Sequence, residues 1–254
     1  MSKYFSAEIV DNDYVNKHIK LLTLRPLSEV IAPEAGQFYM LQAGNTYDPL
    51  LKRPFSIFRY DLNSLQFLYR VIGKGTSCLA AYTNGDRISV IGPLGNGYPA
   101  PEGDFIVIAG GIGIASLWPI LEKFRGSCYL FYGARNRDEL VMSDEAEKLS
   151  KHVFFSTDDG SAGQRGFITT LFKDFLDTSQ AAYRSLPVYA CGPVAMIKNL
   201  SVMISGKSLC CYASLEENMA CGLGACLGCM VKTTSGHRRV CKEGPVFNLG
   251  QILR

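Results

Sequence analysis

Four cysteines near the C-terminus constrain this chain more than any other feature. Cys221, Cys226 and Cys229 are separated by four and then two residues, and Cys241 follows after eleven more. This C-x4-C-x2-C…C spacing is typical of plant-type [2Fe-2S] centres, in which four thiolates hold two irons. Glycines between the cysteines allow the backbone to wrap tightly and to direct N–H groups at sulfur. The spacing therefore predicts an iron–sulfur cluster and a role in electron transfer.

Other uses of these cysteines agree less well with the sequence. A zinc site usually contains two C-x2-C knuckles, and only the one from Cys226 to Cys229 is present. Disulfides require an oxidising compartment, and the N-terminal residues do not read as a secretory leader. We therefore expect a reducing cytoplasm, where thiolates are free to bind iron. Cys78, Cys128 and Cys210 are expected to be buried and inert.

Composition and charge argue against several classes of function. The 254 residues, 47% apolar and 19% charged, describe a globular chain long enough for two ordinary domains. The net charge is +3, from 26 basic and 23 acidic residues, which is too weak and too dispersed to favour nucleic acid. No uninterrupted apolar run reaches the length that spans a membrane. We expect a cytoplasmic protein that binds neither nucleic acid nor membrane.

The first hundred residues read as short strands separated by turns. Residues typical of strands are concentrated in six segments. These are Tyr4–Val10, Ile19–Thr23, Gln37–Gln42, Phe55–Tyr60, Ser64–Ile72 and Arg87–Ile91. Six short strands in this length predict a small antiparallel barrel, with a short helix around Ser77–Tyr82. We assign this barrel to residues 1–99.

The pattern changes near Pro99, where strands begin to alternate with helices. Strands are expected at 105–109, 128–132, 153–157 and 188–191, and helices at 115–124, 139–151, 167–176 and 194–205. This alternation predicts a doubly wound parallel sheet in residues 100–208. Residues 209–254 carry the four cysteines and are too few to enclose an apolar core. A metal cluster is therefore expected to organise them.

Two motifs in the barrel favour a dinucleotide. Arg53-Pro54-Phe55-Ser56 begins a strand, where an arginine can pair with a pyrophosphate and a serine can reach a flavin ring. Arg70-Val71-Ile72 then leads to Gly75-Thr76 at a helix start, where free N–H groups bind phosphate. A surface arginine is the commoner explanation of the first motif taken alone. Two phosphate-type sites in one small barrel suggest FAD.

Three further motifs lie in the α/β part. Gly110-Gly111-Ile112-Gly113 follows a strand and precedes a helix, the context of a nucleotide-binding turn, although Ser116 interrupts the full G-x-G-x-x-G pattern. Cys191-Gly192-Pro193 ends a later strand, at the edge where such sheets bind ligands. Its cysteine is either a small buried residue or a neighbour of a nicotinamide ring. Residues 158–161 form either a plain turn or polar contacts to a nucleotide.

In this order, the Arg-Pro-x-Ser, Gly-Gly-x-Gly and Cys-Gly-Pro motifs resemble the ferredoxin–NADP reductase superfamily. The stretch from Ser214 to Cys229, with Val240 to Phe247, is similar to the electron transfer subunits of B-type, NAD-linked dihydroorotate dehydrogenases. The resemblance covers essentially the whole chain. It implies an FAD site at Arg53, Pro54, Phe55, Ser56, Arg70, Val71, Ile72, Gly75 and Thr76, and cluster ligands at Cys221, Cys226, Cys229 and Cys241.

The resemblance also implies a reaction and a partner. In that family, a catalytic subunit carrying FMN oxidises dihydroorotate to orotate in pyrimidine biosynthesis, and the electrons pass through the cluster and FAD to NAD. We therefore expect a heterotetramer with two subunits of each kind, in which dihydroorotate is oxidised on the partner. Two alternatives stay open. One is an NAD(P)H oxidoreductase of the ferredoxin–NADP reductase type with another partner, and the other is a non-catalytic iron–sulfur sensor module.

Overall fold

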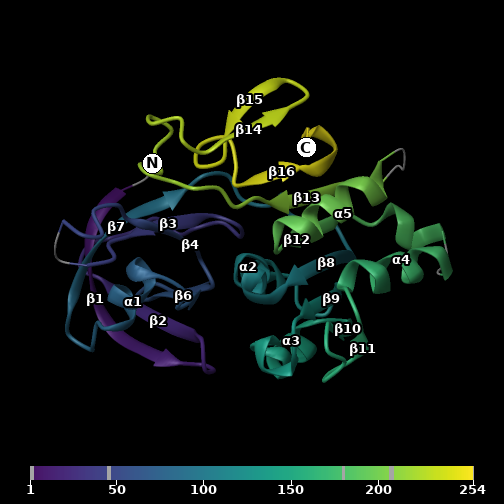
Figure 1. Cartoon of the computed structure of the whole chain (residues 1–254), viewed down its shortest axis with the longest axis horizontal. Helices are drawn as coiled ribbons and strands as arrows, with labels where there is room; N and C mark the ends of the chain where they lie inside the picture. Colours follow the sequence, from purple (N-terminus) through teal and green to yellow (C-terminus); the bar gives the residue numbers. More distant parts are fainter. Residues whose placement is uncertain (1–2, 45–46, 179–180, 206–208, 254) are drawn as a thin grey trace.

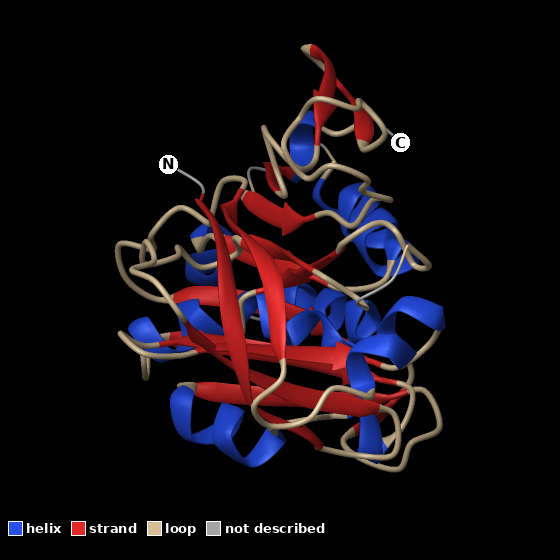
Figure 2. Ribbon diagram, turned by 90° about the vertical axis from the view of Figure 1, so that its left-hand side faces the viewer, coloured by secondary structure: helices blue, strands red, loops and turns tan. Residues whose placement is uncertain are grey.

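Two seven-stranded sheets and one short hairpin contain the strands of the protein (Figure 1). The structure is a computed structural model that describes residues 3–44, 47–178, 181–205 and 209–253. Within these residues, no helix has the length and apolar character needed to cross a membrane. The N-terminal sheet lies beside the second sheet, and the hairpin projects from the C-terminal part (Figures 1 and 2).

The N-terminal sheet is antiparallel, with the strand order β4-β3-β7-β1-β2-β6-β5. Its strands are β1 (Lys3–Tyr14), β2 (Ile19–Pro26), β3 (Phe38–Leu41), β4 (Arg53–Ser56), β5 (Arg59–Tyr60), β6 (Leu65–Arg70) and β7 (Arg87–Leu94). In β1, Phe5, Ala7 and Ile9 are buried and alternate with more exposed residues, as in a strand with one face on a core. Helix α1 (Lys74–Ala80) follows β6.

The predicted barrel is confirmed as a curved antiparallel sheet with edges at β4 and β5. It has seven strands, one more than expected, because the predicted strand Phe55–Tyr60 divides in two. Ile57 N donates to Gln37 O at 3.0 Å, beside β3, whereas Phe58 N donates to Gln66 O at 2.9 Å, in β6. The chain thus changes pairing partner between two adjacent residues, and both of their side chains are buried.

The second sheet has the strand order β11-β10-β9-β8-β12-β13-β16. Its strands are β8 (Phe105–Gly110), β9 (Cys128–Ala134), β10 (His152–Thr157), β11 (Gln164–Arg165), β12 (Val188–Cys191), β13 (Cys211–Ser214) and β16 (Val246–Asn248). All neighbours are parallel except β13 and β16. The predicted parallel sheet is therefore confirmed, and the C-terminal strand makes it mixed.

Helices cover both faces of this sheet, which confirms the doubly wound arrangement. The α-helices are α2 (Ile114–Lys123), α3 (Ser143–Leu149), α4 (Ile168–Thr178) and α5 (Val194–Ile204), and the short 3-10 helices are η1 (Gly111–Gly113), η2 (Arg137–Glu139), η3 (Ala181–Ser185) and η4 (Leu249–Gln251). In β8, Ile106 and Ile108 pack with α4 and α5, whereas Phe105 and Val107 pack with α2 and α3. Every residue of β8 is consequently buried.

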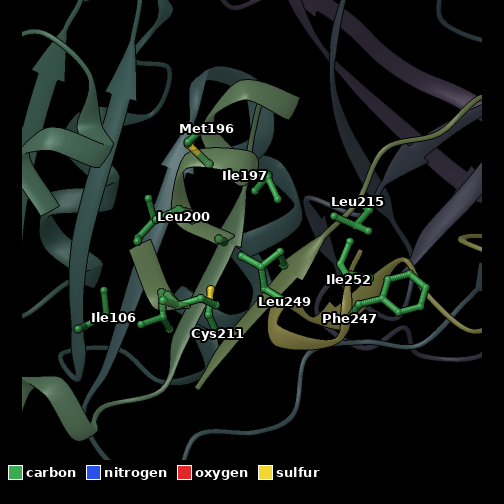
Figure 3. Packing of buried hydrophobic residues seen from close by; sticks show 14 of the residues in the cluster. Ile106, Met196, Ile197, Leu200, Cys211, Leu215, Phe247, Leu249 and Ile252 are labelled. Carbon is green, nitrogen blue, oxygen red and sulfur yellow. The ribbon is translucent and has the colours of Figure 1, made fainter. Parts of the chain in front are cut away.

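The C-terminal segment is part of this core. Leu249 and Ile252 belong to the same apolar cluster as Leu200 of α5 and Cys211 of β13 (Figure 3). The expectation that only a metal cluster organises residues 209–254 is therefore wrong, because β13 and β16 extend the sheet. The strands β14 (Met230–Thr233) and β15 (Gly236–Arg239) form the projecting hairpin.

Three cysteines outside the predicted cluster differ in exposure. Cys128 is buried, as expected, because it begins β9 in the middle of the second sheet. Cys78 is half-buried and Cys210 is exposed, so the expectation of burial is wrong for these two. Cys210 lies immediately before β13, and its neighbour Cys211 is the one that enters the core.

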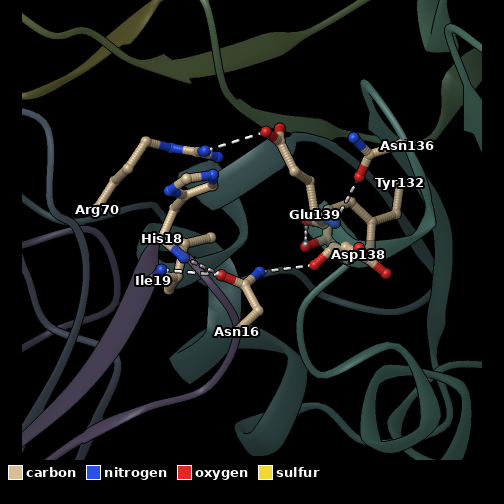
Figure 4. Close-up of polar contacts among 8 residues, drawn as sticks. All are labelled: Asn16, His18, Ile19, Arg70, Tyr132, Asn136, Asp138 and Glu139. Carbon is tan, nitrogen blue, oxygen red and sulfur yellow. Dashed lines mark hydrogen bonds and ion pairs between the residues drawn. The ribbon is translucent and has the colours of Figure 1, made fainter.

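Polar contacts join the two sheets on the side shown in Figure 4. Asn16 Nδ2, in the turn after β1, donates to Asp138 O at 2.6 Å. Arg70 Nη1, at the end of β6, lies 3.0 Å from Glu139 Oε1, and both side chains are largely buried. These contacts connect the barrel to η2.

Candidate functional site

A cavity of about 560 Å³ lies between the two sheets, and we call it the interdomain cavity. Its volume is in the range of small-molecule and cofactor sites. Eight of the predicted site residues line it: Pro54, Phe55, Ser56, Arg70, Ile72, Thr76, Gly113 and Cys191. The second sheet also contributes Ile112, Ser116 and the segment 214–219. Motifs far apart in the sequence are thus gathered around one space.

The remaining predicted barrel residues, Arg53, Val71 and Gly75, support this site without lining the cavity. Gly75 lies under the Arg53 side chain, since a Cβ atom there would stand 2.7 Å from Arg53 Nε. Arg53 Nη1 donates to Leu51 O at 2.6 Å, which fixes the guanidinium over the start of α1. Val71 N donates to His18 O at 2.9 Å. The structure thus brings the two predicted phosphate motifs into direct contact.

Thr76 closes the turn that precedes α1. Its Oγ1 accepts hydrogen bonds from Ile72 N at 3.0 Å and Gly73 N at 3.1 Å. The same hydroxyl donates to Gly73 O at 3.0 Å. The hydroxyl therefore shapes the turn, and any ligand at this wall meets a preformed surface.

Small polar side chains form the wall of the interdomain cavity on the second sheet. Cys191 and Ser214 are paired across β12 and β13, and Ser116 comes from α2. Burial, together with the nearby charge of Glu216, raises the pKa of Cys191 to about 12, so this thiol stays neutral. Ser116 Oγ is buried beside the Cys191 thiol and the Tyr98 hydroxyl. Small polar groups in a cavity wall suit a ligand with polar atoms.

A second cavity, of about 510 Å³, opens at the carboxyl ends of β8, β9, β10 and β12, and we call it the sheet-edge cavity. Six predicted residues line it: Arg70 from the barrel, and Gly110, Gly111, Gly113, Gly192 and Pro193 from the second sheet. A Cβ atom at Gly113 would lie 2.5 Å from Cys191 O. Gly111 has a φ of +52° and open space around it. Gly113 thus permits close packing against Cys191, whereas Gly111 leaves open space on the side of the cavity.

The end of β10 adds polar groups to the sheet-edge cavity. Ser156 and Asp158 line it, and Ser156 Oγ is buried without a partner among the described residues. Asp159 points back into its own turn, where its carboxylate accepts from Ser161 N at 2.9 Å and from Ser161 Oγ at 2.6 Å. Of the two readings of residues 158–161, the turn applies to Asp159 and Ser161, whereas Asp158 faces the cavity.

The two cavities share a wall made of four residues: Arg70, Ile112, Gly113 and Glu216. The sequence did not single out Glu216, which follows β13 by two residues. Its side chain is exposed, and partial desolvation by the cavity wall raises the pKa of its carboxyl group. A ligand in one cavity can therefore touch a ligand in the other at this junction.

The four predicted cluster cysteines lie in two pairs. Cys221 Sγ accepts from Leu223 N at 3.4 Å and from Cys226 N at 3.5 Å. Cys229 Sγ accepts from Cys241 N at 3.5 Å, because the β14–β15 hairpin returns the chain to Cys229. Two thiolate pairs on one loop fit the donor set of a [2Fe-2S] cluster. Within the described residues, no group of three or more His, Cys, Asp or Glu is placed to hold a single metal ion.

Backbone N–H groups prepare this loop for negative charge on sulfur. Burial alone would raise the pKa of Cys221, but hydrogen bonds from Leu223 N and Cys226 N lower it to about 6. Burial and the neighbouring Cys229 instead raise the pKa of Cys241 to about 12. Leu227 has a φ of +60°, a left-handed conformation that is uncommon for leucine. Such local strain is characteristic of functional loops.

These features define a class of protein: an oxidoreductase of the ferredoxin–NADP reductase type, extended by a C-terminal iron–sulfur segment. Residues 107–201 match the model of the oxidoreductase NAD-binding domain. Residues 216–253 match the iron–sulfur cluster binding domain of dihydroorotate dehydrogenase B. The matched ranges contain the Gly110–Gly113 turn and the four cysteines, respectively.

Two relatives identify the family within this class. It is 39% identical over 254 residues to the dihydroorotate dehydrogenase B (NAD(+)) electron transfer subunit of Clostridium acetobutylicum, covering 99% of this chain and 97% of the relative. It is 37% identical to the homolog of that subunit in Aquifex aeolicus, covering 98% of both chains. The chain belongs to the family of electron transfer subunits of NAD-linked dihydroorotate dehydrogenase B.

Solved structures share the fold. The NADH-dependent reduced ferredoxin-NADP oxidoreductase superposes with a TM-score of 0.85 and 25% identity, over 97% of this chain and 89% of that chain. A ferredoxin reductase of carbazole 1,9a-dioxygenase has the same fold, with a TM-score of 0.68 and 20% identity, over 82% and 67% of the two chains. The resemblance seen in the sequence motifs and the predicted fold class are both confirmed.

Proposed function

We propose that this chain carries electrons from a dihydroorotate-oxidising partner subunit to NAD, by way of a [2Fe-2S] cluster and FAD. Membership of the family supports the overall reaction. One observation carries the proposal for this chain: the spatial order of its sites. The cysteine pairs lead through segment 214–219 to the interdomain cavity, and that cavity shares a wall with the sheet-edge cavity. Electron transfer from a partner to NAD requires the cluster, the flavin and the nucleotide to lie next to one another in this order.

We assign FAD to the interdomain cavity. Pro54, Phe55 and Ser56 would contact the flavin, and Arg53 over Gly75 would meet the pyrophosphate. Ser116, a buried hydroxyl in the cavity wall, supports a polar ligand there. When bound, FAD supplies the conversion between single electrons and a hydride, whereas the cluster supplies single-electron transfer. The chain's own task is to hold these groups and to exclude water from the junction.

We assign NAD to the sheet-edge cavity. The Gly110–Gly113 turn would present backbone N–H groups to the pyrophosphate, with Gly192 and Pro193 beside it. Asp158 at the end of β10 would accept hydrogen bonds from the ribose hydroxyls. Arg135 lines the same cavity, so the choice of NAD rests on the relatives, which are named as NAD(+)-linked subunits.

The cluster ligands would be Cys221 with Cys226 on one iron, and Cys229 with Cys241 on the other. We retain residues 1–99, 100–208 and 209–254 as the FAD-binding, NAD-binding and cluster-binding parts. The need to keep free thiolates supports a cytoplasmic location. The partner is proposed to carry FMN, in a heterotetramer with two subunits of each kind.

Exposed apolar side chains beside the cysteines form the proposed partner surface. Leu223, Leu227 and Met230 are 52%, 56% and 37% exposed, respectively, and they lie between or next to cluster ligands. An apolar surface at the electron entry point is typical of a protein interface. Docking there would bring the FMN of the partner near the cluster.

Leu223→Glu tests this surface, because it places a charge in the proposed contact. The interface should lose roughly 2 kcal/mol or more, which is about thirtyfold in affinity. Iron and flavin contents should not change. Leu62→Glu is the matched control, because Leu62 is 97% exposed in a turn of the barrel.

The assay measures association with the catalytic subunit and NAD reduction by dihydroorotate. NADH oxidation with an artificial acceptor serves as the internal reference. If Leu223→Glu binds the catalytic subunit like the unchanged protein, the docking proposal is wrong. If the unchanged chain reduces NAD with dihydroorotate without a partner, the two-subunit mechanism is wrong. A chain that binds no flavin and no nucleotide would instead favour the sensor alternative.

A further inference from the structure

Glu216 is the acidic residue among the four that line both cavities, and its placement follows from the sheet. Parallel pairing sets Ser214 opposite Cys191, at the edge where both cavities open. Leu215 N then donates to Pro245 O at 2.9 Å, which fixes the chain as it leaves β13. Glu216 is the next residue, so a rigid element carries it to the junction.

The charge of Glu216 is not neutralised by the protein. Arg70 is the cation at the junction, and it is already paired with Glu139 at 3.0 Å (Figure 4). Lys198 and Lys232 share a third, smaller cavity with Glu216, but neither forms an ion pair with it. Glu216 has no hydrogen-bond or ion-pair partner among the described residues. The charged residues that line the sheet-edge cavity are Arg70, Arg135, Glu139, Asp158 and Glu216, and their charges sum to −1.

The junction is where a nicotinamide ring in the sheet-edge cavity would approach a flavin in the interdomain cavity. The nicotinamide ring of NAD⁺ carries a positive charge, and that of NADH is neutral. We propose that Glu216 is a specificity-determining residue that contacts the nicotinamide and favours NAD⁺ over NADH through its unpaired carboxylate. This inference rests on the assignment of NAD to the sheet-edge cavity. Such a preference would assist the reaction, because NAD⁺ is the electron acceptor and the product NADH would be released more readily.

Glu147 provides a matched control. It is an exposed acid in α3 and lines neither cavity. Glu216→Gln and Glu147→Gln both remove one negative charge with little change in shape. The net charge of the protein is then the same in both variants, so any difference between them arises from position.

The experiment measures the dissociation constants of NAD⁺ and NADH separately, by titration of the holoprotein with cluster and FAD in place. Glu216→Gln should weaken NAD⁺ by about tenfold, the size of a close charge pair in a partly hydrated site, and should change NADH by less than about twofold. Glu147→Gln should leave both constants unchanged. Glu216→Asp keeps the charge and should retain a preference for NAD⁺ close to that of the unchanged protein.

The outcomes separate this inference from the proposed function. Equal weakening of NAD⁺ and NADH by Glu216→Gln would show a structural role and overturn the inference, as would an unchanged ratio of the two constants. Both results would leave the NAD site itself in place. If the unchanged holoprotein bound neither nucleotide, the assignment of NAD to this chain would fail as well. Flavin absorbance and iron content of each variant report whether the fold is intact.

Discussion

Gly111 and Gly113 lie in one turn, and replacing each with alanine should remove different ligands. Gly113 has a φ of −57°, which any residue adopts, but an added Cβ would lie 2.5 Å from Cys191 O and 2.7 Å from Cys191 C. Gly111 has a φ of +52°, and a Cβ there meets nothing within 4 Å. Gly113→Ala should therefore destabilise the protein because its Cβ atom would collide with the backbone of Cys191. Gly111→Ala should destabilise it because alanine rarely adopts a positive φ.

The two substitutions should cost similar amounts of stability. For Gly113→Ala, overpacking against backbone costs about 1–3 kcal/mol, and the lower entropy of the unfolded chain returns about 0.4–1 kcal/mol. The free energy of unfolding should fall by about 1–2 kcal/mol, or roughly 2–8 °C in Tm for a chain of this length. For Gly111→Ala, the left-handed conformation costs about 1–2 kcal/mol.

Ligand binding should separate the two variants. Gly113 lines both cavities, so its displacement should weaken FAD and NADH together. Gly111 lines only the sheet-edge cavity, so Gly111→Ala should weaken NADH and leave FAD content unchanged. Flavin absorbance of the purified protein and titration with NADH measure the two effects. A Gly113→Ala protein with normal stability and flavin content would refute the close packing on Cys191, and loss of FAD from Gly111→Ala would refute the division between the cavities.

Three further predictions concern single side chains. Arg53→Ala should weaken FAD at least about tenfold in a flavin-fluorescence titration, because charge-assisted hydrogen bonds are lost, and unchanged affinity would make Arg53 an ordinary surface residue. Cys226→Ser should abolish the cluster and retain FAD by iron and flavin analysis, whereas stoichiometric zinc in unchanged protein made with ample iron would contradict the cluster. The Arg239 guanidinium lowers the pKa of Glu243 from 4.5 to about 2, so this pair adds stability that is complete above pH 4.5 and is lost as the pH falls toward 2. In a Cys226→Ser background, Glu243→Gln should reduce the change in Tm across that window, and parallel curves would refute the linkage.

The cluster could be predicted because its ligands are local in sequence. Cys221, Cys226 and Cys229 lie within nine residues, so their spacing alone limits the loop they can form. Cys241 is further away, and the pairing of Met230 with Arg239 in the β14–β15 hairpin returns it to Cys229. The motif therefore predicts the ligands, and the structure adds the arrangement of the four cysteines in two pairs.

The C-terminal strands could not be predicted in the same way. β13 and β16 have four and three residues, too few for a reliable hydrophobic period. Their place is decided by neighbours far away in the sequence: β12 pairs with β13, and β16 completes the edge. Without that pairing, the residues around the cysteines read as a segment with no core.

Contacts between distant segments also explain why motifs predicted some of the cavity-lining residues and missed others. Phe55, Gly113 and Cys191 belong to motifs that carry their own local context. Glu216 belongs to no such motif, and only the strand order brings it to the wall between the cavities. Ser116 was visible only as an interruption of a glycine pattern, and its place in the cavity wall appears once α2 is packed on the sheet.

The strand β13 leads both to the junction of the two cavities and to the cysteine segment. β13 lies between β12 and β16, so its register is fixed from both sides. From its end, Glu216 reaches the junction of the cavities, and Cys221 follows five residues later. Both residues thus follow the same strand in the chain. Leu249 and Ile252 pack the C-terminal segment onto α5. Cys229 and Cys241 belong to the same apolar cluster as Leu249 and Ile252. The core under the C-terminal segment therefore anchors two of the proposed cluster ligands to the sheet whose edge lines both cavities.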